Sequence, residues 1–183
     1  MTEPTVRPRR INWHLVGWSL AALPLLAPLI AMRVTDEVNW TVFDFAFASI
    51  IIGSAGLALE IAVRQSRSGA YRAGAALAAL TAVLLLWING AVGIIGDEGE
   101  PANRLYPFVV ALALGGSLIA RLKPQGVSRA MTIAAAAQLA VPLAASLLWP
   151  GQSPALAQPE VIGLTVVFCG FWLGAAALAR RSA

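Results

Sequence analysis

The chain has 183 residues, of which 58% are hydrophobic and only 12% are charged, and its formal net charge is +4. A soluble domain carries about 25% charged residues, so this composition excludes a soluble globular protein and indicates a membrane protein. One cysteine and one histidine exclude an intramolecular disulfide, a CxxC redox pair, a two-histidine metal site and bis-histidine haem within one chain. We therefore expect no cofactor and no bound metal.

Six apolar segments follow one another along the chain, each close to the ~20 residues that cross a bilayer. In chain order, we predict transmembrane helices over residues 15–32, 42–63, 73–96, 105–120, 130–149 and 161–179. The connections are short, which leaves no room for a separate soluble domain. The sequence therefore predicts one all-α membrane domain over residues 1–183, a polytopic bundle of six transmembrane helices that begins with a basic tail over residues 1–12.

Basic residues concentrate on one side of this zigzag. Of the thirteen Lys and Arg residues, only Arg33 and Arg104 fall on the other side. Short cytoplasmic loops carry such an excess of positive charge, so we predict an N-in/C-in protein of the bacterial cytoplasmic (inner) membrane. The basic residues form no stripe with interleaved aromatic residues, so we expect contacts with the lipid bilayer and none with nucleic acid. The opposite loops hold the acidic residues Asp36, Glu37, Asp97, Glu98, Glu100 and Glu160.

The two inner turns resemble each other. Arg64, Gly69 and Arg72 in the turn after the second segment recur 57 residues later in the turn after the fourth segment. A parallel duplication of the two hairpins explains this recurrence. Chance similarity between basic turns flanked by Ala-rich helices explains it as well.

Two acidic residues lie inside the predicted helices. Asp44 follows Trp40 by about 6 Å along the second helix, and it is either a proton or cation site near the outer face or a helix N-terminal acid favoured by the dipole. Glu60 precedes Arg64 by four residues, the spacing of an intrahelical ion pair. The ion pair explains Glu60 without a transport function.

The end of the third segment is the most distinctive part of the sequence. Asn89 is a membrane-buried amide that needs a partner. Gly90, Gly93 and Gly96 recur every three residues and predict a bare strip on the helix. Either the strip lets a neighbouring helix approach while Asn89 bonds across the contact, or the glycines loosen the helix end and expose carbonyl groups to a cavity.

A resemblance rests on this stretch. The stretch from Trp87 to Asn103 contains Asn-Gly-Ala-Val-Gly-Ile-Ile-Gly, which begins at Asn89, then an acidic turn, then Pro-Ala-Asn. It resembles a small family of uncharacterised bacterial inner-membrane proteins, and the similarity extends from about Asn39 to the turn after the fourth segment. The resemblance implies a helical membrane fold and a location, with no assigned activity.

Two further features lie in the last two segments. Gln138 is a deep polar residue that either joins Thr81, Asn89 and Ser146 in an interhelical hydrogen-bond set or contributes to a ligand site. Gly170 and Gly174 form a GxxxG motif, which predicts helix packing, either within the bundle or against a second copy or another membrane protein.

No catalytic motif is present in the sequence, so we expect no enzyme. The first functional hypothesis is a non-enzymatic accessory, scaffold, lipid-binding or pigment-binding bundle. The alternative is a small transporter or channel with an outward-facing polar site around Asp44, Asn89 and Gln138. The acidic outer loops fit either a solvated rim or a weak divalent-cation site.

Overall fold

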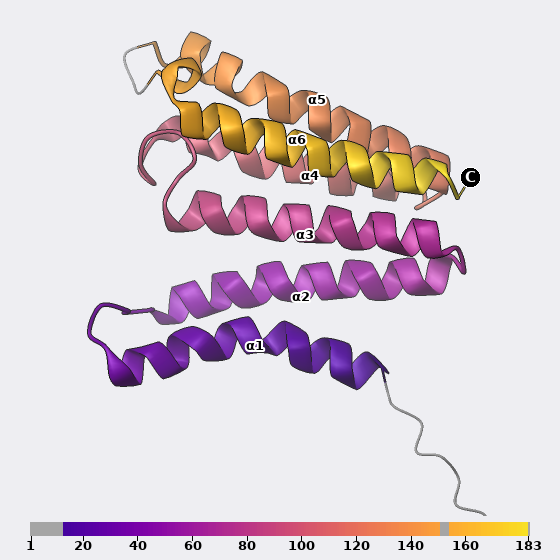
Figure 1. Ribbon diagram of the computed structural model, residues 1–183, viewed down its shortest axis with the longest axis horizontal. Coiled ribbons are helices and arrows are strands. Elements are labelled where there is room, and N and C mark those ends of the chain that lie inside the picture. Colours follow the sequence, from indigo (N-terminus) through magenta and orange to yellow (C-terminus); the bar gives the residue numbers. More distant parts are fainter. Residues whose placement is uncertain (1–12, 151–153, 183) are drawn as a thin grey trace, which may run out of the picture. The chain divides into compact units, whose positions relative to one another are not determined.

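The computed structural model describes residues 13–150 and 154–182, so the predicted tail over residues 1–12 lies outside the described residues. Within the described ranges the secondary structure is entirely helical. The six α-helices (Figure 1) are α1 (Trp13–Val34), α2 (Val42–Gln65), α3 (Gly69–Ala91), α4 (Leu105–Ile119), α5 (Pro124–Leu148) and α6 (Pro159–Arg180). Two short 3-10 helices, η1 (Pro101–Arg104) and η2 (Ala155–Ala157), precede α4 and α6. All six helices, with η1 extending α4, are long and apolar enough to cross a membrane, which confirms the all-α class and the six spans.

The helix boundaries follow local capping signals that lie outside the apolar segments. The α3 helix begins at Gly69, before the predicted residue 73, because the Ser68 hydroxyl accepts a hydrogen bond from the Tyr71 amide. The α5 helix begins at Pro124, six residues before the predicted start, and proline is favoured at a first helical position. Hydropathy therefore located the spans and missed their polar first turns.

The chain divides into two compact units, and the division falls within α2 after Gly56. Unit 1 contains α1 and the first part of α2, and unit 2 contains residues 57–183. In unit 1, Trp18 packs over Gly56, where a Cβ atom would come within 2.9 Å of the indole ring. The large apolar side chains of α1 are mostly exposed, as Leu20 and Ile30 are, which suits contact with lipid chains.

Unit 2 holds the core. Within it, α6 packs against both α3 and α5, and α4 packs against α5 (Figure 1). The largest fully buried side chains are Trp172, Tyr106 and Phe168, which fill the space between these helices. Bulky buried side chains thus surround α6 on the faces that it turns to its neighbours.

Small residues set the spacing of these helices. A Cβ atom on Gly74 of α3 would lie 3.1 Å from the Ala175 carbonyl oxygen of α6. A Cβ atom on Gly116 of α4 would lie 2.9 Å from the Cβ atom of Ala130 on α5. Close backbone approach at small residues is the usual packing mode of membrane helices, where lipid supplies no hydrophobic driving force between helices.

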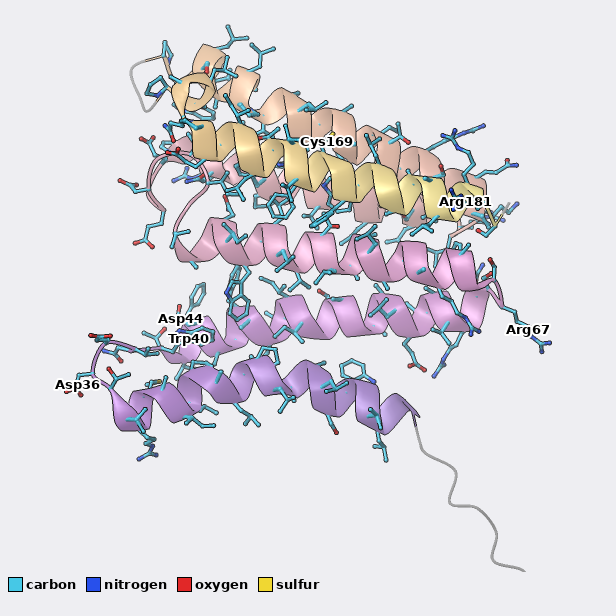
Figure 2. All side chains as sticks on the ribbon, in the orientation of Figure 1. Asp36, Trp40, Asp44, Arg67, Cys169 and Arg181 are labelled. Carbon is cyan, nitrogen blue, oxygen red and sulfur yellow. The ribbon has the colours of Figure 1, made fainter. Side chains whose placement is uncertain are left out.

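Unit 2 has two chemically different ends. We call the basic end the part formed by the α2–α3 turn, the α4–α5 turn and the C-terminus of α6, where Arg67 and Arg181 lie (Figure 2). We call the acidic end the part formed by the α3–α4 loop, which carries Asp97, Glu98 and Glu100, and by the first turn of α6, which carries Glu160. Helices α3 and α5 run from the basic end to the acidic end, and α4 and α6 run back.

Candidate functional site

Asp44 belongs to a helix cap in unit 1. Its Oδ2 atom accepts hydrogen bonds from the Thr41 amide at 2.7 Å and from the Thr41 hydroxyl at 2.8 Å, and the Asp44 amide donates back to the Thr41 hydroxyl at 3.4 Å. This reciprocal pattern is a capping box at the start of α2. The geometry therefore favours the helix N-terminal interpretation. Asp44 belongs to unit 1, whereas Asn89 and Gln138 belong to unit 2.

The predicted ion pair on α2 is confirmed. The Arg64 guanidinium lies 2.8 Å from Glu60 Oε1, four residues earlier on the same helix, and its Nε atom also donates to this oxygen. Arg64 is largely exposed, so the pair contributes only about 0.3–0.5 kcal/mol to the free energy of unfolding.

The glycine strip at the end of α3 does not form. The helix ends at Ala91, so only Gly90 of the three predicted glycines is helical. Gly93 and Gly96 have φ values of +74° and +62°, a left-handed backbone that glycine adopts without strain. The prediction of a helix to residue 96 with Gly93 and Gly96 as packing residues is therefore wrong. The two glycines reverse the chain into a buried loop.

Asn103 holds this loop together. Its Oδ1 atom accepts hydrogen bonds from the amides of Ile94 and Ile95 at 3.1 and 2.9 Å. Its Nδ2 atom donates to the carbonyl oxygens of Ile95 and Asp97 at 3.1 and 2.6 Å. Asn103 is only 4% exposed, so its amide satisfies four backbone groups in a buried place. This bonding was not predicted from the sequence, because only the left-handed glycines bring Asn103 back to the end of α3.

Gln138 is the central polar residue of unit 2. It is 0% exposed on α5, and neither its Nε2 nor its Oε1 atom has a hydrogen-bond partner in the described part of the chain. The predicted interhelical set is wrong, since the Thr81 and Ser146 hydroxyls donate instead to carbonyl groups of their own helices, those of Leu77 and Pro142. A buried amide with no hydrogen-bond partner lowers the free energy of unfolding by about 1–3 kcal/mol, so Gln138 destabilises the fold at this position.

Packing contacts show which residues lie at the depth of Gln138. On α6, the Cys169 thiol donates a 3.7 Å hydrogen bond to the Ala135 carbonyl of the antiparallel α5. Three residues further toward the acidic end, Gln138 is level with Val166, next to Thr165. On α4, Gly116 lies against Ala130 of α5. Gln138 is eight residues after Ala130, and Phe108 is eight residues before Gly116 on the antiparallel α4. Gln138 is therefore at the depth of Phe108, about 3 Å from that of Tyr106.

Tyr106 and Thr165 are also buried without hydrogen bonds. Tyr106 is 0% exposed and Thr165 is 5% exposed. The two hydroxyls lie near enough to interact, yet neither forms a hydrogen bond of acceptable geometry with the other or with another described residue. Three helices, α4, α5 and α6, therefore place unsatisfied polar groups at one depth.

Two more groups of this kind lie above and below that level. Leu77 of α3 lies against Gly174 of the antiparallel α6. Asn89, twelve residues after Leu77, is therefore at the depth of Ile162, twelve residues before Gly174. This depth is about 4.5 Å nearer the acidic end than that of Thr165. Trp172 follows Thr165 by two helical turns, about 10.5 Å nearer the basic end. The Asn89 Oδ1 atom and the Trp172 Nε1 atom are buried, and neither has a hydrogen-bond partner among the residues described.

We call these five side chains the polar column: Asn89, Tyr106, Gln138, Thr165 and Trp172. Along the helix direction these residues span about 15 Å of depth, from Asn89 near the acidic end to Trp172 near the middle of unit 2. Its carboxamides, hydroxyls and indole donate and accept hydrogen bonds without carrying charge. Asn89 and Gln138 were predicted from the sequence as candidates, and the other three were not. The spacing of Thr165, Phe168 and Trp172 on one face of α6 was the available signal.

The thiol and the acidic residues are further candidates for a metal site within the described residues. Cys169 is buried and bonded to the Ala135 carbonyl, as expected of a small core residue. Within residues 13–150 and 154–182, no group of three or more His, Cys, Asp or Glu side chains is placed to hold a metal ion.

The two glycines of the GxxxG motif in α6 have different surroundings. Gly174 faces α3, where a Cβ atom would lie 3.1 Å from the Leu77 side chain, which agrees with a packing function inside the bundle. Gly170 has open space within 4 Å, and so does Gly163, one heptad earlier. These two glycines leave a bare strip on α6 that unit 2 does not cover.

The fold defines a multi-pass membrane protein. Comparisons with protein families, with characterised proteins and with solved structures find no match to this chain. The candidate site is therefore interpreted from its own geometry.

Proposed function

We propose that this chain is a non-enzymatic, N-in/C-in protein of the bacterial inner membrane that binds a small uncharged ligand in the polar column. The expected class of non-enzymatic binding bundles is thereby narrowed to one site and one kind of ligand. The excess of Lys and Arg at the basic end supports a cytoplasmic position for that end. The Asn89 end of the polar column then lies in the periplasmic half of the membrane.

Gln138 carries the proposal. Gln138 is 0% exposed, and neither of its polar atoms has a hydrogen-bond partner among the described residues. Buried polar groups are nearly always hydrogen-bonded, so this amide is the position at which a bound ligand would gain most. A methionine or leucine of similar volume would avoid the desolvation cost of about 1–3 kcal/mol. A ligand that completes the hydrogen bonds of the amide would remove this cost.

The chemistry of the column indicates the charge of the ligand. None of its five side chains carries a charge, and a charged ligand buried among them would lack a counterion. Gln138 presents a donor and an acceptor on one planar group, and its complement is a neutral molecule with an adjacent donor and acceptor, such as a carboxamide. Phe168, on the same face of α6, supplies apolar surface beside these groups.

Thermal unfolding in lipid nanodiscs tests the proposal. We expect Gln138→Met to raise the unfolding temperature of the protein without ligand, because the variant no longer buries an unsatisfied amide. We expect acetamide to stabilise the wild type and not the variant, and acetate, its charged counterpart, to stabilise neither. Native mass spectrometry of both proteins would identify a small molecule that co-purifies with the wild type only.

Leu139→Met is the matched control, because Leu139 is the next residue on α5 and is 54% exposed. It should change neither the unfolding temperature nor the acetamide response. If Gln138→Met lowers stability as a core defect does, and acetamide and acetate act alike on both proteins, the polar column is a structural feature and the proposal is wrong.

Transport is the second candidate, favoured by the extent of the column from Asn89 to Trp172. A proteoliposome swelling assay with acetamide separates transport from static binding. Transport predicts a protein-dependent flux that falls in Asn89→Leu and is unchanged in Asp44→Asn, because Asp44 caps a helix. A flux equal to that of empty liposomes leaves binding as the function.

A further inference from the structure

The two turns at the basic end are tied to each other. The Tyr71 hydroxyl, at the start of α3, donates a 2.7 Å hydrogen bond to the Leu122 carbonyl in the α4–α5 turn. The Gln65 side chain, at the end of α2, donates a 3.5 Å hydrogen bond to the neighbouring Arg121 carbonyl. The α2–α3 turn and the α4–α5 turn, which both carry basic residues, therefore lie side by side at the basic end of unit 2.

Some of the basic side chains here are used within the fold. Arg72 donates to the carbonyl oxygens of Ser66 and Val63 and so closes the end of α2. Arg64 pairs with Glu60. The side chains of Arg67, Arg121 and Lys123 are exposed, and no hydrogen bond or ion pair engages them among the described residues.

The backbone at Arg121 is unusual. Arg121 and Leu122 have φ values of +54° and +56°, a left-handed conformation that is unfavourable for residues other than glycine. Glycine adopts this conformation freely. The backbone alone would therefore favour glycine at position 121, and the arginine side chain needs another explanation. Backbone strain of this kind is concentrated at functional positions.

Apolar side chains lie directly before this turn. Leu118 and Ile119, at the end of α4, are 65% and 86% exposed. A ligand that covers them beside Arg121 must combine hydrocarbon with negative charge. An anionic phospholipid has both, and guanidinium groups bind phosphate oxygens in a bidentate manner.

We propose that the tied turns form a binding site for an anionic phospholipid. The lipid phosphate is bound by Arg67, Arg121 and Lys123, and an acyl chain lies along Leu118 and Ile119. Juxtamembrane basic clusters attract anionic lipids by about 1 kcal/mol per charge, or about fivefold in affinity. The lipid site uses residues of the basic end and none of the polar column, so it is tested separately from the proposed ligand.

Native mass spectrometry of the full chain in detergent, titrated with phosphatidylglycerol or phosphatidylcholine, tests the site. We expect phosphatidylglycerol to bind more tightly. The triple variant Arg67→Gln, Arg121→Gln, Lys123→Gln should lose affinity on the order of 100-fold, which is fivefold for each of three charges. Arg104→Gln is the matched control, because Arg104 is exposed but lies at the acidic end, directly before α4, and this variant should bind as the wild type does.

Two further measurements distinguish a lipid site from a bare phosphate site and from a loss of folding. Arg121→Gly should unfold at the same or a higher temperature than the wild type, since glycine suits the left-handed backbone, and should still bind phosphatidylglycerol about fivefold more weakly. Glycerol phosphate should not displace the lipid, because it lacks acyl chains. Unchanged binding in the triple variant, equal losses in Arg104→Gln, or full displacement by glycerol phosphate would each overturn the proposal.

Discussion

The Tyr71 hydroxyl and the Leu122 carbonyl oxygen are joined by a 2.7 Å hydrogen bond across 51 residues of sequence. Tyr71 is 3% exposed, so this bond is shielded from the surroundings. It connects two turns of unit 2 that are distant in the sequence. We expect Tyr71→Phe to lower the free energy of unfolding by about 1 kcal/mol, since it leaves the carbonyl group unpaired. Reversible unfolding in mixed micelles measures the change.

Tyr106→Phe is the control for this prediction. Both tyrosines are buried, but the Tyr106 hydroxyl has no hydrogen-bond partner in the described chain. Its removal should leave stability unchanged or increase it. Equal losses in the two variants would show that the Tyr71 bond contributes nothing beyond the burial of its ring.

The four hydrogen bonds of Asn103 lead to a second prediction. Asn103→Asp keeps the shape of the side chain and places an oxygen against the carbonyl groups of Ile95 and Asp97. We expect a loss of about 2–4 kcal/mol in the free energy of unfolding, because two hydrogen bonds become repulsive contacts in a buried place. Hydrogen exchange at the Ile94 and Ile95 amides should accelerate. Glu98→Gln, at an exposed loop position, should change neither quantity.

Gly90 and Gly93 should respond oppositely to alanine. Gly93 has a φ of +74°, and a Cβ atom there would clash with the Asp97 backbone and the Asn103 amide, so Gly93→Ala should be strongly destabilising. Gly90 is exposed and helical, so Gly90→Ala should stabilise the protein by up to about 1 kcal/mol. Thermal unfolding of the two variants measures both effects. Similar losses in both would favour the continuous glycine strip that the sequence suggested.

The orientation of the chain is a fourth prediction. In a Cys169→Ala background, Arg67→Cys and Glu98→Cys place single thiols at the basic and the acidic end, both at exposed positions. We expect a membrane-impermeant maleimide to label Glu98→Cys in intact bacterial cells and to label Arg67→Cys only after lysis. The reverse pattern would invert the assigned topology.

The number and class of the helices were predictable because each span is a long apolar segment. The end of α3 was not, because Ile94 and Ile95 continue the apolar pattern after the helix has stopped. Hydropathy cannot distinguish a helix that reaches Gly96 from a buried loop, since both exclude polar side chains. The difference lies in the backbone angles of Gly93 and Gly96 and in one distant amide, that of Asn103.

The candidate site was predictable only in part, for a related reason. Asn89 and Gln138 stand out because amides are rare in apolar segments. Tyr106, Thr165 and Trp172 are ordinary residues of membrane helices, and their unsatisfied atoms are evident only when four helices are packed together. For Asp44 the sequence left two interpretations, a proton or cation site and a helix N-terminal acid, and the hydrogen bonds to Thr41 favour the second.

The boundary between the two units falls in the middle of a continuous helix, after Gly56 of α2. Proteases act in water, and this boundary lies within a membrane span, so digestion of the intact protein cannot release either unit. A gene fragment that begins at Leu57 would start with a helical remnant ending at Gln65, about 13 Å long and too short to cross the bilayer. Any fragment intended to isolate unit 2 must therefore carry the whole of α2 and begin in the loop before Thr41.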